Sequence, residues 1–337
     1  GRPRPVIDPW DFGWTPDWKK SVPVASTGVS LRSVVEAGTC KRSLQLDFDD
    51  DVANKSVQWI YDYGRQSDRP RPFFHTVSMT HPHNPYVTTQ PYWDLYKHAD
   101  VDMPRVGRIA YKDLDAHSQR LFKAYKFGEY TVTDEDVRRS RHAYYAMTSY
   151  IDDQVGRLLG ALRDMDLEKN TAVIFHSDHG DMLGERGLWY KWMHFEGACR
   201  IPMIVAMPGA KASRVKAPAS LLDFLPTVVE MASAGQRKVE PVAPLEGMSL
   251  MPAVKGAELP YDRPVFAEMN ADGTYSPSFM VRKGDWKIIA CEGDPTMLFD
   301  LRNDPDEMKN LAGKPDTAKI GAELMALVNS NWSPAAL

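Results

Sequence analysis

Asp178 and His179 follow directly after an apolar segment, residues 172–176, which is typical of a buried strand. At the carboxyl end of a strand in a parallel α/β sheet, the pair would offer one oxygen and one nitrogen ligand to a single divalent cation. Spacing alone leaves an alternative open, in which Asp178 caps the next segment and His179 lies at the surface.

His81 and His83 follow a second apolar segment, residues 72–79, and stand beside prolines at positions 82 and 85. Prolines restrict the backbone around them, and either histidine could bind an anion or act as a general acid. Taken by itself, the segment favours a proline-rich turn with a structural histidine. Two histidine-bearing turns, each after a predicted buried strand, favour convergence at one crevice.

Lys191 is flanked by aromatic residues, Trp189 and Tyr190 before it and Trp192 after it. Such neighbours would desolvate the ammonium group and strengthen its attraction for an oxyanion. The ordinary alternative is a lysine at the surface in contact with water.

Apolar periodicity predicts the elements that position these residues. A helix is expected over 49–63, a longer one begins at a capping-box-like Thr133 with Asp136, and a third covers 221–234. Strands are expected over 72–79, 172–176 and 202–207. Alternation of strands and helices predicts an α/β domain around a largely parallel sheet.

The pattern changes after residue 256, where short strand candidates are separated by Gly, Asp and Pro; they cover 265–269, 279–282 and 286–291. A last helix is expected over 319–329. We therefore predict two domains, a main α/β domain over 1–256 and a small antiparallel subdomain over 257–337.

The composition narrows the classes of function. The 337 residues carry a net charge of -4, so no basic field indicates nucleic-acid binding. No apolar run is long enough to predict a membrane span. Three cysteines without a CxxC pair predict neither a disulfide framework nor a thiolate zinc site. This cysteine usage favours a cytoplasmic protein, with the periplasm as the alternative.

Longer stretches resemble the sulfatases. Residues 176–191 and 195–202 are similar to the second metal-binding motif of that family, and 80–86 to its H-x-P active-site segment. Residues 286–311 resemble the family's C-terminal strands, so the resemblance runs from about residue 70 to 312. Within the family, three further segments are similar to choline sulfatases: 11–17, 92–96 and 137–141.

The resemblance implies an alkaline-phosphatase-like sandwich around a mostly parallel mixed sheet, and hydrolysis of sulfate esters. It implies Asp178 and His179 as metal ligands, with Ca²⁺ expected first and Mg²⁺ or Mn²⁺ as alternatives. His83 would bind sulfate or protonate the leaving alcohol, and Lys191 would hold a sulfate oxygen. His81 is implied only as a neighbour of the substrate site.

The family's nucleophile is a formylglycine made from Cys or Ser in a C/S-x-P-x-R motif, and no such motif occurs in these residues. We therefore expect the nucleophile and further metal-binding aspartates to lie before Gly1, and the chain alone to be inactive. We also expect a sheet edge and apolar surface left open by the missing strand. The resemblance further implies a homo-oligomeric parent protein.

The substrate is expected to be choline sulfate or a related small sulfate ester. Trp14 and Glu268 match positions that bind the quaternary ammonium in choline sulfatases, where aromatic faces and a carboxylate offset its charge. Residues 18–40 lack the aromatic stretch expected next in those proteins. Two alternatives remain: a phosphonate monoester hydrolase or phosphodiesterase of the same superfamily, and a non-catalytic sulfatase-like binding protein.

Overall fold

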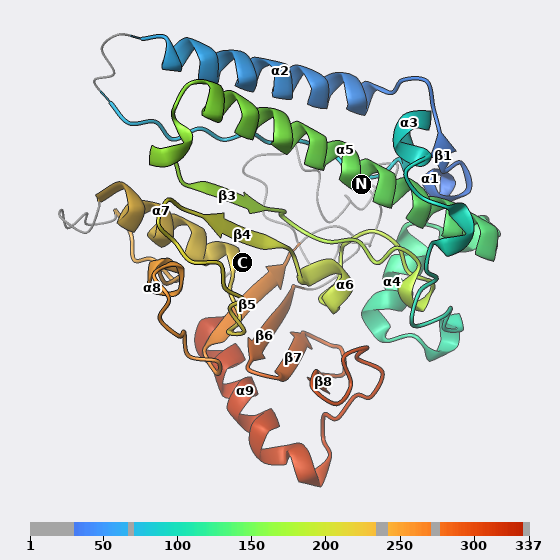
Figure 1. Ribbon diagram of the computed structural model, residues 1–337. Helices are drawn as coiled ribbons and strands as arrows, with labels where there is room; N and C mark the ends of the chain where they lie inside the picture. The colour runs from blue at the N-terminus through green and yellow to red at the C-terminus, as the bar shows by residue number, and fades with distance from the viewer. Residues whose placement is uncertain (1–29, 67–70, 234–241, 271–276, 333–337) are drawn as a thin grey trace, which may run out of the picture.

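The computed structural model describes residues 30–66, 71–233, 242–270 and 277–332. Two long helices, α2 (Leu44–Gly64) and α5 (Asp134–Asp164), lie side by side along the strand pair β3 (Val173–His176) and β4 (Met203–Ala206) (Figure 1). Helices α7 (Phe224–Ser233) and α8 (Met251–Val254) lie on the opposite side of this pair from α2 and α5.

The predicted start of α5 is confirmed by a reciprocal capping box. The Asp136 backbone N–H donates to the Thr133 hydroxyl at 3.2 Å, and the Thr133 N–H donates to the Asp136 carboxylate at 2.9 Å. Apolar side chains of α2 and α5 then pack together with Val173 of β3. This packing sets the helices over the strand that leads to the Asp-His pair.

Strand β4 corrects one prediction, because it pairs with β3 in the antiparallel sense, Val173 opposite Ala206 and His176 opposite Met203. A parallel return needs a crossover, usually an α-helix, that runs back along the sheet to the start of the first strand. The connection here holds only short helical turns, among them α6 (Glu196–Cys199). It therefore stays at the carboxyl end of β3, and β4 runs back from there.

Residues 72–79 correct a second prediction, because the structure assigns them no strand. Apolar composition and flanking prolines are satisfied equally by an extended segment that lacks a hydrogen-bonded neighbour. Apolar side chains in this part of the molecule are also exposed, Phe74 to 66% and Ile204 of β4 to 59%.

The C-terminal part is an antiparallel sheet, as predicted, but it has a fourth strand beyond the three expected, in the order β5-β6-β7-β8. Its strands are β5 (Pro264–Met269), β6 (Ser278–Lys283), β7 (Trp286–Cys291) and β8 (Met297–Asp300). Helix α9 (Ala318–Asn331) covers one face, with Leu324 and Val328 packed against Val281, Ile288 and Leu298. The domain boundary at residue 256 stays a prediction.

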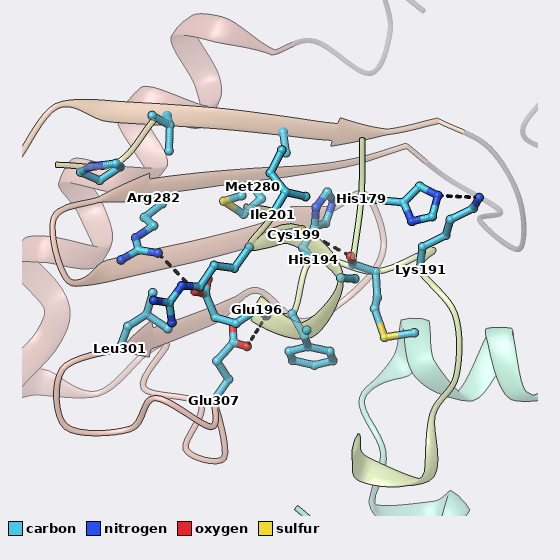
Figure 2. Close-up of a pocket in the computed structure, with 18 of the residues that line it drawn as sticks. His179, Lys191, His194, Glu196, Cys199, Ile201, Met280, Arg282, Leu301 and Glu307 are labelled. Atoms are coloured by element: carbon cyan, nitrogen blue, oxygen red, sulfur yellow. Dashed lines mark hydrogen bonds and ion pairs between the residues drawn. The ribbon is translucent and has the colours of Figure 1, made fainter. Parts of the chain in front are cut away.

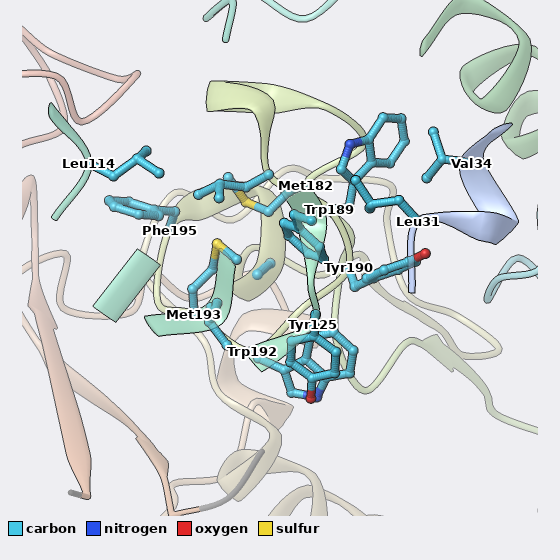
Figure 3. Close-up of a cluster of buried hydrophobic side chains, with 14 of the residues drawn as sticks. Leu31, Val34, Leu114, Tyr125, Met182, Trp189, Tyr190, Trp192, Met193 and Phe195 are labelled. Atoms are coloured by element: carbon cyan, nitrogen blue, oxygen red, sulfur yellow. The ribbon is translucent and has the colours of Figure 1, made fainter. Parts of the chain in front are cut away.

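Shorter elements complete the main part: α1 (Arg32–Val35), β1 (Gly38–Thr39), β2 (Val87–Thr88), α3 (Gln90–Trp93) and α4 (Ala116–Ala124). Apolar side chains of α1 and α4, among them Val34 and Leu121, belong to the same core cluster as the aromatic run around Lys191. Trp189 and Tyr190 are each 2% exposed, and Trp192 stacks on Tyr125 with ring centroids 3.9 Å apart (Figure 3). The aromatic residues are thus core, and they hold the backbone of the Lys191 loop.

Candidate active site

Lys191 joins two loops that are far apart in the sequence. Its Nζ lies 3.1 Å from Nε2 of His83 and 2.8 Å from Nε2 of His179. Figure 2 shows the contact between His179 and Lys191 at one end of a pocket. The structure therefore brings together three of the predicted residues, of which the outer two are separated by 108 positions.

The hydrogen bonds assign the same tautomer to both histidines. His83 Nδ1 lies 2.8 Å from the Asn84 carbonyl oxygen, and His179 Nδ1 lies 2.8 Å from the Gly180 carbonyl oxygen. A carbonyl only accepts, so each Nδ1 carries the proton and each Nε2 presents a lone pair to the Lys191 ammonium. Burial also lowers the pKa of His83, which keeps its ring neutral near pH 7.

Asp178 lies beside His179, with its Oδ2 3.6 Å from His179 Nε2 and its side chain 82% exposed. A carboxylate oxygen and an imidazole nitrogen 3.6 Å apart fit two positions of a divalent cation site. No group of three potential ligands occurs among the residues that the structure describes. The pair therefore fits part of a metal site, and further ligands would have to come from outside the described residues.

Asp181 positions the lysine from the other side of the same motif. It accepts hydrogen bonds from the Tyr86 hydroxyl at 2.7 Å and from the backbone N–H groups of Tyr190 at 3.0 Å and Leu183 at 2.9 Å. Tyr190 has a φ of 67°, a conformation that costs energy for a residue with a side chain. The hydrogen bond to Asp181 and the packing of the ring hold Tyr190 there, which directs the next residue, Lys191, toward the histidines.

A close backbone contact requires glycine after His179. A Cβ atom at Gly180 would lie 2.1 Å from the carbonyl oxygen of Gly197, and the Gly180 N–H donates to the Ala198 carbonyl at 2.8 Å. The loop after β3 and the loop before β4 thereby touch backbone to backbone. Any side chain at this position would push the Asp178–His179 turn away from the Lys191 loop.

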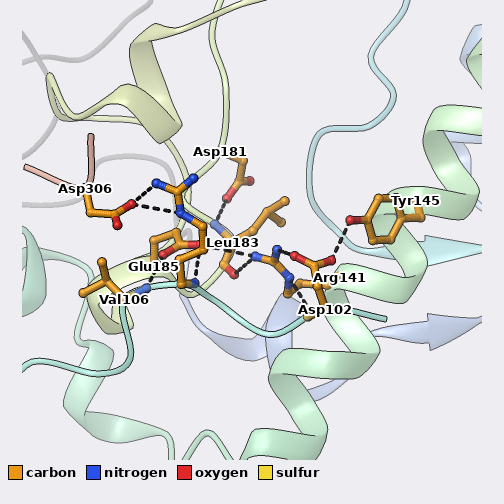
Figure 4. A network of polar contacts seen from close by, with 9 residues as sticks. Asp102, Val106, Arg141, Tyr145, Asp181, Leu183, Glu185 and Asp306 are labelled. Atoms are coloured by element: carbon orange, nitrogen blue, oxygen red, sulfur yellow. Dashed lines mark hydrogen bonds and ion pairs between the residues drawn. The ribbon is translucent and has the colours of Figure 1, made fainter. Parts of the chain in front are cut away.

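Arg141 of α5 fastens the turn that follows Asp181. Its guanidinium donates to the Leu183 carbonyl at 3.1 Å and also pairs with Asp102, which accepts from the Tyr145 hydroxyl at 2.6 Å (Figure 4). In the same network, the Glu185 carboxylate accepts from the Val106 N–H at 2.9 Å. The arginine-rich segment 137–141 therefore has a structural use, the support of the Asp-His loop.

His81 does not meet the other candidates and has a different partner. Its Nδ1 lies 2.6 Å from Asp49 Oδ2, and its Nε2 has no hydrogen-bond partner among the described residues. Asp49, fully buried in α2, also accepts from the His81 N–H at 2.8 Å and from the N–H and hydroxyl of Thr80. No local pattern in the sequence marks Asp49 as a site residue, because only the fold brings α2 against residues 80–81.

Asp49→Asn is expected to destabilise the protein by about 1–3 kcal/mol at pH 7, because an amide nitrogen would then face buried donors. Although burial alone raises a carboxyl pKa, the hydrogen bonds from His81 and Thr80 lower that of Asp49 overall. Its stabilisation is thus present above the unfolded pKa of about 3.9 and is lost as pH falls through the lower folded pKa. Urea unfolding from pH 7 to pH 3 measures both effects.

Asp51→Asn, on the same helix, is the matched control, because Asp51 is exposed and pairs only at the surface with Lys55. We expect a change within about 0.5 kcal/mol for this variant. Equal losses of stability in the two variants would show that the hydrogen bonds of Asp49 to residues 80–81 do not stabilise the fold.

Glu268 of β5 is exposed and lines the same groove as Asp178, His179 and Lys191. The groove runs between the β3–β4 part and the C-terminal sheet and encloses about 1580 Å³. The structure therefore places Glu268 on the site side of the molecule. Trp14 lies outside the described residues.

The family model described as "Sulfatase" matches residues 11–234. The chain belongs to the sulfatase family. A second model, "N-sulphoglucosamine sulphohydrolase, C-terminal", matches residues 184–332 and covers the C-terminal sheet. The resemblance seen in the sequence is therefore confirmed.

Among sulfatase relatives, the chain is 42% identical to a choline-sulfatase of Rhizobium meliloti over 312 residues, 92% of this chain and 60% of that protein. It is 30% identical to arylsulfatase K of Gallus gallus, over 82% of this chain and 55% of that protein. The sulfatase chain thus spans somewhat more than half the length of these relatives.

Solved structures share the fold at low identity. Phosphonate monoester hydrolase of Agrobacterium radiobacter superimposes with a TM-score of 0.69 at 23% identity, covering 92% of this chain and 64% of that one. A structure described as a putative sulfatase of Bacteroides thetaiotaomicron superimposes with a TM-score of 0.65 at 23% identity. The match covers 84% of this chain and 62% of that one. The α/β, alkaline-phosphatase-like fold class is confirmed.

Proposed function

We propose that the protein is a metal-dependent sulfuric ester hydrolase that acts on choline sulfate or a related small sulfate ester. The contact of the Lys191 ammonium with the Nε2 atoms of His83 and His179, 3.1 and 2.8 Å away, carries the proposal. This contact brings together a cation (Lys191), a candidate metal ligand (His179) and a candidate general acid (His83). Hydrolysis of a sulfate ester requires such groups around the same sulfate.

In this proposal, Lys191 exchanges its histidine contacts for a non-bridging sulfate oxygen. His83 is neutral without substrate, and a sulfate anion held next to it favours the imidazolium, because an opposite charge raises a histidine pKa. The added proton sits on Nε2, since Nδ1 already donates to Asn84. From Nε2, His83 donates it to the departing alcohol oxygen.

Asp178 and His179 would hold a divalent cation, with Ca²⁺ proposed first and Mg²⁺ or Mn²⁺ as alternatives. When bound, such a cation polarises a sulfate oxygen and offsets the charge of the leaving oxygen. The formylglycine nucleophile used in this family would come from outside these 337 residues, since they contain no C/S-x-P-x-R motif.

The choline-sulfatase relative and Glu268 in the groove support a cationic leaving group. We expect Glu268→Gln to raise KM for choline sulfate about 10-fold, because one carboxylate facing a desolvated cation contributes about 1–2 kcal/mol. The KM for a neutral aryl sulfate should stay within about two-fold. Steady-state kinetics of the full-length protein with both esters measures the difference.

The same assays separate the alternatives. Turnover of phosphonate monoesters in preference to sulfate esters would contradict the proposal and favour the phosphonate hydrolase. No turnover of either class, with retained sulfate binding, would favour the non-catalytic binding protein.

We expect removal of the metal ion by a chelator to abolish turnover of the sulfate ester and added Ca²⁺ to restore it.

Compartment and assembly stay predictions. The described residues include no helix that is both long and apolar enough to cross a membrane. We propose a cytoplasmic protein that forms homo-oligomers, which fractionation and light scattering of the full-length protein would test.

A further inference from the structure

Lys287 of β7 carries an ammonium group that is completely buried, at 0% exposure. Its Nζ donates to the His194 carbonyl oxygen at 2.9 Å, to Glu307 Oε1 at 2.8 Å and to Glu196 Oε1 at 2.7 Å. An ammonium has three N–H donors, so each of them has one acceptor. Lysine is almost never buried in this way unless it is paired.

A second cation and a backbone N–H extend the cluster around Lys287. Arg282 of β6 binds the second oxygen of Glu196 at 3.2 Å, and the Glu196 N–H donates to Glu307 Oε2 at 2.8 Å (Figure 2). Two cations therefore meet two carboxylates. Burial alone lowers the pKa of Lys287, but the carboxylates of Glu307 and Glu196 outweigh burial and raise it. The ammonium thus stays charged at neutral pH.

Two of the three acceptors belong to the loop that carries the catalytic lysine. His194 and Glu196 follow Lys191 by three and five residues, and the His194 ring also contacts the Ser278 hydroxyl of β6 at 3.0 Å. On the other side of Lys191, Asp181 holds the Tyr190 N–H at 3.0 Å. The backbone of Lys191 is therefore held before it by the Asp-His motif and after it by the C-terminal sheet.

We propose that Lys287 is a positioning residue for Lys191, through which the C-terminal sheet fixes the sulfate-binding ammonium between His83 and His179. The inference rests on the proposed function. It assigns a use to the Trp-Lys-Ile segment at 286–288 that the proposed chemistry leaves unexplained. The competing explanation is an ion cluster that stabilises the fold and has no effect on the site.

The test is the affinity of the full-length protein for inorganic sulfate, measured by isothermal titration calorimetry with Ca²⁺ present. Lys287→Met removes all three hydrogen bonds while keeping the length of the side chain. We expect sulfate to bind about 10-fold to 100-fold more weakly, because a displacement of about 1 Å is enough for such a loss. Hydrogen exchange of the peptide 188–199 should become faster in the same variant.

Arg263→Met is the matched control, because it also removes a cation from a buried ion pair. Arg263 binds both oxygens of the fully buried Asp223, at 2.7 and 2.9 Å, and Asp223 otherwise accepts from the Ser220 and Met248 N–H groups. We expect this variant to lose thermal stability and to bind sulfate within about two-fold of the wild type. Both variants are compared at a temperature at which each is folded.

If Lys287→Met does not fold, Glu196→Gln replaces it, since this change weakens one contact of Lys287 and leaves Glu307 in place; a reduced sulfate affinity is again expected. Unchanged sulfate affinity in a folded, destabilised variant would overturn the positioning role alone. Absence of sulfate binding by the wild type would overturn the proposed function, and the inference with it.

Discussion

Lys191→Met is expected to lower kcat/KM for sulfate ester hydrolysis by the full-length protein about 10²–10³-fold, the usual loss on removing one preorganised group that stabilises developing charge. The reason is geometric. The Lys191 ammonium lies 3.1 Å from His83 and 2.8 Å from His179, and the buried aromatic residues beside it fix its backbone. Steady-state kinetics and circular dichroism of the variant measure the loss and check the fold.

Lys216→Met is the matched control for this experiment. Lys216 lines the same groove and is exposed, so the substitution makes the same change in charge without removing a contact to the histidines. We expect its kcat/KM to remain within about two-fold of the wild type, since surface substitutions have small effects. Similar losses in the two variants would show that only the overall charge of the groove matters, which contradicts a specific site at Lys191.

Leu188→Ala is expected to destabilise the protein by about 2–5 kcal/mol, because it leaves a cavity in a core that relaxes only partly. Leu188 is 0% exposed and begins the run of buried residues through Tyr190 that precedes Lys191. Urea unfolding monitored by tryptophan fluorescence measures the change. The lower stability should appear together with weaker sulfate binding, since the same residues support the Lys191 loop.

Leu95→Ala makes the identical chemical change at a side chain that is 62% exposed. It should alter the free energy of unfolding by less than about 0.5 kcal/mol. If the two leucine variants proved equally stable, the Lys191 loop would not be part of the core, and the rigidity that we assign to Lys191 would have no basis.

Local signals in the sequence were enough to predict the four helices α2, α5, α7 and α9 and three of the four C-terminal strands. Thr133 and Asp136 cap α5 because a capping box involves only residues three positions apart. The strands β5, β6 and β7 occur where short apolar runs alternate with Gly, Asp and Pro. The candidate residues Asp178, His179, His83 and Lys191 were also found in this way, since each lies in a short motif.

Contacts between distant segments decided how the strands pair and which partners the buried charges have. The antiparallel pairing of β4 depends on where the long connection from His176 leads, and the apolar run itself has no direction. Asp49 has no local feature that marks it, and the resemblance of residues 286–311 to the family's C-terminal strands gives Lys287 no role. Only the fold brings these two residues to residues 80–81 and to His194. A buried charge is stable only with partners in three dimensions, so its partners cannot be found from spacing along the chain.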